Sequence, residues 1–112
     1  MSKHLGDAPV VAWLIFLGAA LLEVGGDALI RLGLRANDLR LIVAGFVPLG
    51  CYGLVVNLVK WDFAELLGAY VAVFALVSIL GGHFLFKEKL PVSTWVGLGF
   101  IVTGALIIQF LD

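Results

Sequence analysis

The sequence predicts an all-α integral membrane protein, built as a bundle of four transmembrane helices. Of its 112 residues, 62% are hydrophobic and only 13% are charged, and the mean hydropathy is +1.15. The charged residues gather in short clusters between long apolar runs. A soluble domain of this length needs more polar side chains to cover its surface. The length allows one domain, residues 1–112.

Four segments are long enough to cross a membrane as helices. A hydrocarbon core of about 30 Å needs roughly 20 helical residues, and we expect the spans at residues 10–31, 41–59, 64–86 and 92–111. The first reaches this length only if it includes the acidic residues Glu23 and Asp27, whereas the second and fourth contain no charge. Because the links are short, we expect consecutive helices to be antiparallel neighbours.

The distribution of Lys and Arg predicts the orientation. With four spans, both termini lie on the same side as the loop at Lys60. That side carries two basic residues, Lys3 and Lys60, and the opposite side carries five, which are Arg31, Arg35, Arg40, Lys87 and Lys89. Because cytoplasmic loops carry the excess of Lys and Arg, we expect a multi-pass protein of the cell inner (plasma) membrane with these two loops in the cytoplasm and both termini outside. A signal peptide at the start is disfavoured, because three further spans follow.

The first span carries the strongest functional signal. Glu23, Asp27 and Arg31 are spaced i, i+4 and i+8, so they form one stripe along one helix face. A charge in the middle of a membrane is costly, and such residues usually face a cavity or a partner. A carboxylate there can hold either a proton or a cation, which is the minimum chemistry of proton-coupled cation exchange.

Asp27 has a second interpretation. It precedes Arg31 by one helical turn, in the favourable acid-before-base order, so the two can neutralise each other. Glu23 is two turns from Arg31, which is too far for an easy direct pair. Gly25 and Gly26 would let another helix or a ligand approach the backbone closely.

These residues resemble a known family. The stretch "AALLEVGGDALIRLGLR" is similar to the first helix of the small multidrug resistance family, within the drug/metabolite transporter superfamily. That family has a membrane glutamate, a glycine three residues later and a basic residue eight later, which match Glu23, Gly26 and Arg31. The stretch "KEKLPVSTWVGLGFIVTGALII" resembles the family's closing loop and fourth helix, in which Gly97 and Gly104 would line a helix–helix contact.

The third span shows both likeness and departure. "GAYVAVF" offers Tyr70 and Phe74 where the family places aromatic residues. Tyr70 could donate a hydrogen bond to a carboxylate or stack on a cation, or it could be a packed aromatic residue. The family's usual Tyr-x-x-Trp and glycine-rich bend are missing, and Asp27 is an additional acid. The chain is also similar to another four-helix group of the same superfamily, whose function is poorly defined.

The resemblance implies a homodimer whose central chamber holds two copies of Glu23. Four helices alone cannot enclose a water-lined chamber around a buried acid, whereas two copies can, which also favours a dimer. The basic residues predict one dominant orientation, so the dimer is either parallel or formed with a related chain of opposite orientation.

The resulting hypothesis is a small secondary transporter, a proton-coupled antiporter of an organic cation of the drug, guanidinium or quaternary ammonium class. Glu23, Asp27, Tyr70 and Phe74 would bind the cation and protons, Arg31 would be a charge partner, and the remaining assignments are helix packing or dimer contacts at Gly26, Gly97 and Gly104. The alternatives are a non-transporting membrane subunit whose charged stripe meets another protein, and a lipid or metabolite transporter in which Arg31 holds an anionic head group.

Other classes of function lack a signal in the sequence. No nucleophile–base arrangement predicts an enzyme, and the single cysteine, Cys51, excludes an intrachain disulfide and a cysteine-based metal cluster. "GLGFIVTG" lies within a predicted membrane helix, so it is not a nucleotide-binding loop. We expect no cofactor and no nucleic-acid partner.

Overall fold

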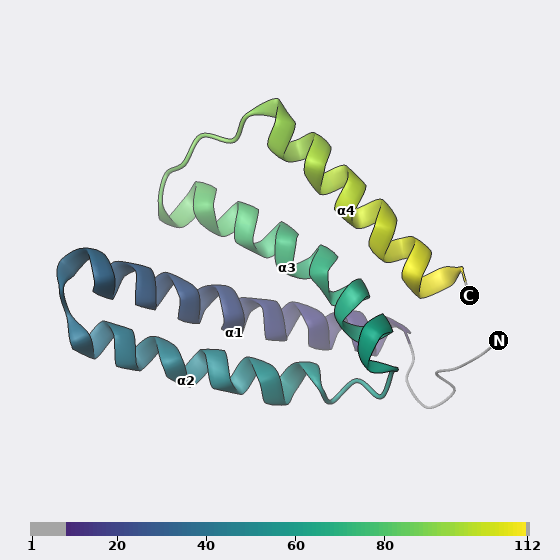
Figure 1. Ribbon diagram of the computed structural model, residues 1–112, viewed down its shortest axis with the longest axis horizontal. Coiled ribbons are helices and arrows are strands. Elements are labelled where there is room, and N and C mark those ends of the chain that lie inside the picture. Colours follow the sequence, from purple (N-terminus) through teal and green to yellow (C-terminus); the bar gives the residue numbers. More distant parts are fainter. Residues whose placement is uncertain (1–8, 112) are drawn as a thin grey trace.

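The structure is a computed structural model that describes residues 9–111. Lys3, which contributes to the predicted orientation, lies outside this range. The described chain forms four α-helices, which are α1 (Pro9–Ala36), α2 (Leu39–Val56), α3 (Phe63–Leu85) and α4 (Val92–Phe110) (Figure 1). All four are long and apolar enough to cross a membrane, so the predicted fold class is confirmed.

The helix ends differ from the predicted spans most clearly at α1. This helix continues to Ala36 instead of ending near residue 31. At about 1.5 Å per residue its 28 residues extend about 42 Å, which exceeds a hydrocarbon core of about 30 Å. Hydropathy locates only the part of a helix that lies in lipid. The last turns of α1, which contain Arg31 and Arg35, extend the same helix beyond that part.

The helices lie in the spatial order α2, α1, α3, α4 (Figure 1). The backbone of α1 packs against both α2 and α3, and among the described helices α4 packs against α3 alone. The expectation that all consecutive helices are neighbours is therefore wrong for α2 and α3, because α1 lies between their backbones. The result is an open arrangement in which much of α4 and α2 has no neighbouring helix within residues 9–111.

Glycines bring α1 and α2 close together. A Cβ atom on Gly26 would lie 2.7 Å from the carbonyl oxygen of Gly45, and one on Gly45 would lie 2.6 Å from that of Gly26. Only glycine permits this approach between helix backbones. Gly26 therefore serves a contact within the chain, and α2 continues unbroken through Pro48.

Small and aromatic side chains fill the contact between α1 and α3. Phe16 is fully buried, and its ring meets those of Trp13, Trp61 and Tyr70 edge-on, with centroids 5.4, 5.5 and 5.7 Å away. The alanines Ala12, Ala19, Ala20 and Ala69 surround these rings and are also buried. This cluster packs α3 against α1.

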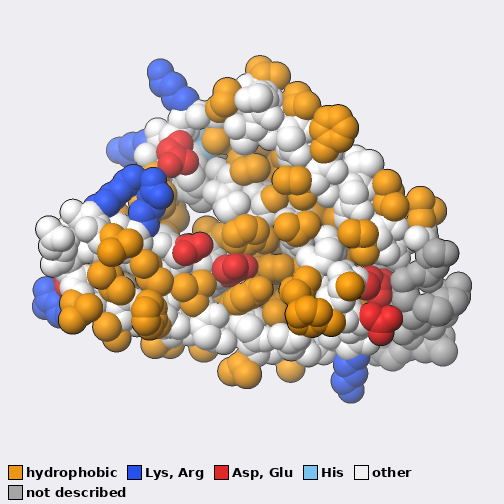
Figure 2. Space-filling model, viewed as in Figure 1, with side chains coloured by type: hydrophobic (Ala, Val, Ile, Leu, Met, Phe, Trp, Pro, Cys, Tyr) orange, Lys and Arg blue, Asp and Glu red, His pale blue; other side chains and the backbone are white. Residues whose placement is uncertain are grey.

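The outer faces of the helices are apolar. Phe46 and Leu54 on α2 and Phe100 on α4 are 60%, 75% and 76% exposed, and hydrophobic side chains cover much of the visible surface (Figure 2). A soluble monomer rarely exposes apolar side chains so widely, whereas a bilayer solvates them. The surface is thus that of a protein that spans a membrane.

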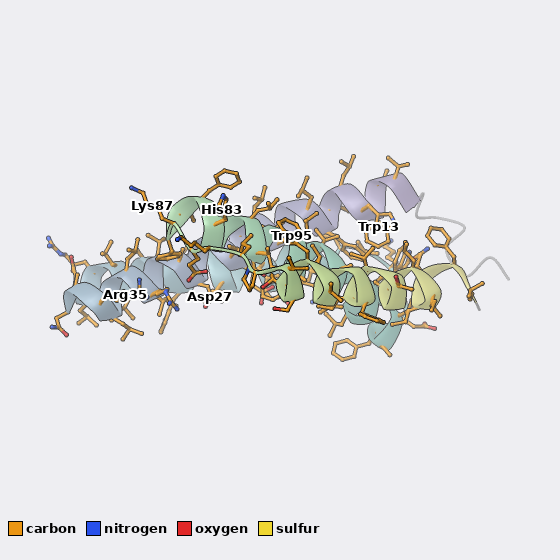
Figure 3. The ribbon with its side chains drawn as sticks, turned by 90° about the horizontal axis from the view of Figure 1, so that it is seen from above. Trp13, Asp27, Arg35, His83, Lys87 and Trp95 are labelled. Carbon is orange, nitrogen blue, oxygen red and sulfur yellow. The ribbon has the colours of Figure 1, made fainter. Side chains whose placement is uncertain are left out.

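Five of the six basic residues within residues 9–111 lie toward one end of the bundle, and the sixth, Lys60, lies at the other end. The turn between α1 and α2 and the loop between α3 and α4 lie at the same end (Figure 1), and Arg35 and Lys87 project there, whereas Trp13 lies toward the other end (Figure 3). The chain turns at Asn37 (φ 52°), and the side chain of Asp38 then caps α2 by accepting a hydrogen bond from the Arg40 N–H at 3.0 Å. That this end faces the cytoplasm stays a prediction.

Candidate functional site

Glu23 lies at the middle of α1 and meets a side chain from α3. The Tyr70 hydroxyl donates a hydrogen bond to Glu23 Oε1 at 2.8 Å. Tyr70 is 4% exposed, and Glu23 is half-buried. A hydrogen bond to a carboxylate is stronger than one between neutral groups, especially away from water. Both interpretations of Tyr70 hold at once, since it is a packed aromatic residue and also a hydrogen-bond donor to Glu23.

Three further rings surround the hydroxyl-bearing ring of Tyr70. Tyr52 of α2 stacks on it with centroids 5.5 Å apart and an interplanar angle of 28°, Phe74 lies one turn along α3 at 6.3 Å, and Phe16 completes the group. Aromatic faces attract cations. The side chains of Glu23 and Tyr70 thus sit beside an aromatic wall that α1, α2 and α3 build together.

A cavity of about 300 Å³ lies next to this wall. Its polar and aromatic lining is contributed by Asp27, Arg31, Phe74, Ser78, Phe86 and Glu88. Glu23 does not line it. In Figure 2, the visible face of the molecule is hollowed between basic side chains (blue) toward the left and acidic side chains (red) near the centre. The cavity therefore lies between α1, α3 and the loop that follows α3.

Arg31 points to Glu88 and not to Asp27. Its Nη2 atom lies 4.0 Å from Glu88 Oε2, and its guanidinium lies over the ring of Phe86, 5.2 Å from the centroid. Arg35 lies over the same ring at 5.5 Å. The expected pair between Asp27 and Arg31 is absent: within residues 9–111, Asp27 has neither an ion pair nor a hydrogen bond.

The loop after α3 explains why Glu88 reaches Arg31. Lys87 has a φ of 56°, in the left-handed region, and this turns the chain back over the end of α3. The N–H of Glu88 then donates to the Gly82 carbonyl oxygen at 3.1 Å, a contact typical of a helix C-terminus. The Glu88 side chain is held so close to Gly82 that a Cβ atom there would strike its Oε1.

The two acids therefore have different surroundings although they are one turn apart. Glu23 accepts a hydrogen bond from Tyr70 behind the aromatic wall, and Asp27 is exposed in the cavity. Such a pair can hold a proton at one carboxyl and attract a positive charge to the other. No group of three or more His, Cys, Asp or Glu side chains within residues 9–111 could hold a metal ion.

The glycines of α4 differ from Gly26. A Cβ atom on Gly97 or Gly104 would meet nothing within 4 Å, so neither glycine serves a contact inside the described chain.

Three residues near the site, Tyr52, Phe86 and Glu88, are not among the candidate residues that the sequence predicts. Tyr52 lies in an uncharged span with no feature that sets it apart. Glu88 is the one acid between two lysines, in "KEK", and an acid within a basic cluster is a weak signal of a specific ion pair. The sequence gives no signal for Phe86, and its place in the site is evident only from the two guanidinium groups that lie over its ring in the structure.

Comparison with known proteins gives one family. The family model described as "Uncharacterised BCR, YnfA/UPF0060 family" matches residues 10–111. The chain is 29% identical over 103 residues to the UPF0060 membrane protein YfjF of Bacillus subtilis, covering 90% of this chain and 94% of that protein. It is 35% identical over 101 residues to a UPF0060 membrane protein of Staphylococcus carnosus (88% and 94%) and 33% identical over 106 residues to one of Nocardia farcinica (90% and 94%). No solved structure matches.

Proposed function

We propose that this chain, which belongs to the YnfA/UPF0060 family of membrane proteins, is a small secondary transporter that exchanges protons for an organic cation. The observation that carries the proposal is the hydrogen bond from Tyr70 to Glu23 at the middle of α1, directly beside a cavity. An acid at this depth is costly in lipid and by default marks a transport pathway or a proton relay.

The surroundings of Glu23 support a site that handles charge. Tyr70 supplies a hydrogen-bond donor, and the rings of Tyr52 and Phe74 offer faces on which a cation can lie. Arg31, the nearest basic residue on the same helix face, pairs with Glu88. Glu23 is therefore not neutralised by a basic side chain of the described chain, which a purely structural acid in a membrane would require.

The likeness to the small multidrug resistance family supports the same reaction. Glu23, Gly26 and Arg31 match the spacing of that family's first helix, and the organic cation is the substrate class that the resemblance implies. In this chain Gly26 packs α1 against α2, so the matching glycine has a structural explanation that does not depend on transport.

We further propose that the working unit contains two chains in the cell inner membrane. The open order of the helices leaves α4 in contact with α3 alone, and the hollow beside Asp27 opens on one face (Figure 2). A second copy, or a related chain, would cover such a face and shelter both cavities from lipid. Closed dimers with one shared surface are the commonest protein assemblies.

A proteoliposome assay tests the exchange. Purified protein is reconstituted, candidate organic cations are added, and proton release is followed with a pH-sensitive dye. We expect release by the unmodified protein and by Asp62→Asn, a matched loss of an exposed carboxylate whose side chain does not cap α3, but not by Glu23→Gln. Release that survives Glu23→Gln would refute the proposal.

The alternative of a non-transporting subunit makes a different prediction. In that case the charged stripe of α1 would bind another protein through Arg31, although Arg31 already has an acidic partner in its own chain. Absence of cation-driven proton release, together with co-purification of a partner that Arg31→Glu abolishes, would favour this alternative over transport.

A further inference from the structure

We propose that the two carboxylates of α1 divide the exchange between them, so that Asp27 receives the charge of the cation while Glu23 holds the proton. This inference rests on the proposed exchange but goes beyond it, because it assigns the cation to a different residue from the proton. It also defines the cation as small and singly charged, with N–H groups and one apolar or aromatic part.

The first support is the position of each acid relative to the cavity. Asp27 lines the cavity, is exposed there, and has no hydrogen bond or ion pair within residues 9–111. Glu23 is outside the lining and already accepts the hydrogen bond of Tyr70. A cation that enters the cavity therefore meets Asp27, whereas Glu23 does not line the cavity and already accepts a hydrogen bond at one of its two oxygens.

The second support is the position of Arg31. Arg31 lies one helical turn beyond Asp27, so its guanidinium is the expected ion-pair partner of the Asp27 carboxylate. Glu88 and the ring of Phe86 instead hold it away, at 4.0 Å and 5.2 Å. The loop after α3 thereby keeps Asp27 open for a mobile cation, and this gives the acid in "KEK" a specific role.

The third support is the chemistry of the cavity wall. The side chains that line the cavity include two acids, Asp27 and Glu88, and one base, Arg31, so the lining has one more acidic side chain than basic ones. The Ser78 hydroxyl donates to the Ala75 carbonyl oxygen at 2.9 Å, which leaves its oxygen as an acceptor. Acceptors suit a cation with N–H groups.

The size and apolar lining of the cavity define the rest of the ligand. Phe74 offers an aromatic face for its apolar part. The volume of about 300 Å³ is at the lower end for a ligand pocket, so a molecule with a single ring fits better than a large drug.

The exchange follows from the spacing of the two acids. They lie about 6 Å apart along the helix axis. A positive charge bound at Asp27 therefore repels the proton that Glu23 holds in the proposed exchange, and this proton passes to water. The titratable side chains around Glu23 are Tyr70 from α3, Tyr52 from α2, and Asp27 on α1 itself. The O–H bond of Glu23 is the one covalent bond of the protein that breaks in this step.

Calorimetry on the purified full chain tests the division of roles. Benzylammonium is the probe, benzyl alcohol is the neutral control, and benzyltrimethylammonium is the cation without N–H groups. Titration in buffers of different ionisation enthalpy gives both the affinity and the number of protons released. We expect the unmodified protein to bind benzylammonium with proton release, and to bind both controls at least about tenfold more weakly, as expected for lost contacts to a charged group.

Four variants separate the assigned roles. Asp27→Asn should weaken benzylammonium binding by about tenfold or more, whereas Glu23→Gln should keep binding but release no proton. Glu88→Gln should allow Arg31 to pair with Asp27 and should weaken benzylammonium binding by a similar factor. The double variant Glu88→Gln, Arg31→Gln should restore benzylammonium binding. Asp62→Asn is the control, and thermal unfolding of each variant shows whether the fold is kept.

The contradicting results are distinct. Unchanged binding in Asp27→Asn, with loss of binding in Glu23→Gln, would overturn the division of roles and leave the exchange at Glu23 standing. Unchanged binding in Glu88→Gln would overturn the role of Arg31 and Glu88. If the unmodified protein neither binds benzylammonium nor releases protons with any organic cation, both this inference and the proposed function fail.

Discussion

The hydroxyl of Tyr70 lies 2.8 Å from Oε1 of Glu23 and donates to it, joining the N-terminal half of α3 to the middle of α1. Tyr70 is also part of the aromatic cluster that packs these two helices together. One side chain therefore serves both the packing of the bundle and the acid on which the proposed exchange depends.

Replacing Tyr70 with Phe keeps the ring and removes only the donor. We expect Tyr70→Phe to lower the free energy of unfolding by about 1–3 kcal/mol, because the half-buried side chain of Glu23 loses its hydrogen-bond donor. Unfolding in mixed detergent micelles measures this. Tyr52→Phe, which removes the hydroxyl from the stacked neighbour, should change stability by less than about 0.5 kcal/mol. Equal effects would show that the bond to Glu23 contributes nothing specific.

Two adjacent glycines of α1 should respond oppositely to alanine. Gly26→Ala places a Cβ atom 2.7 Å from the carbonyl oxygen of Gly45 and must force α1 and α2 apart, at a cost of about 1–3 kcal/mol. Gly25→Ala meets nothing within 4 Å and should be neutral or stabilising by up to about 1 kcal/mol, since alanine favours helix. Thermal unfolding of the two variants compares them directly, and a stable Gly26→Ala would contradict the close packing.

The sequence predicts where the helices of this protein lie along the chain much better than it predicts which helices are neighbours in space. Long apolar runs are visible in hydropathy, because lipid imposes the same requirement on every span. The spatial order is not visible in this way, since α1 takes the place between α2 and α3 through the contact of Gly26 with Gly45 and the rings around Phe16. Such contacts depend on which helix faces meet.

The site could be predicted only in part, for the same reason. Glu23 is evident because an acid in the middle of a span is costly, and Phe74 is visible by its spacing from Tyr70. The partner of Arg31 is not evident, because the i+4 rule on a single helix favours Asp27, whereas the left-handed turn at Lys87 delivers Glu88 from a distant loop. Local spacing cannot weigh a tertiary ion pair against a local one.

The orientation can be tested with single cysteines that leave the charge count unchanged. In a Cys51→Ser background, Pro91→Cys lies in the loop between α3 and α4, and Leu58→Cys lies between α2 and α3. The five basic residues at the α1–α2 and α3–α4 end predict that this end is cytoplasmic. In intact cells, a membrane-impermeant maleimide should therefore label Leu58→Cys and spare Pro91→Cys. The reverse pattern would place the Asp27 cavity nearer the outer surface.

The glycines of α4 give the test for a second chain. Gly97→Leu and Gly104→Leu add side chains where nothing of the described chain lies within 4 Å, so the fold of a single chain should tolerate them. If two copies meet through α4, these substitutions should lower the fraction of crosslinked dimer in native membranes several-fold, because close approach of membrane helices needs small residues.

Gly50→Leu and Gly53→Leu on α2 are the matched controls for that experiment. These glycines also have nothing within 4 Å, so they add the same bulk to a different outer face. Loss of crosslinking in the α4 variants alone would locate the dimer contact at α4, and an equal loss in both sets would indicate a general effect of bulk. Unchanged crosslinking in all four would exclude α4 as the contact. The two cavities would then have to be covered through another face.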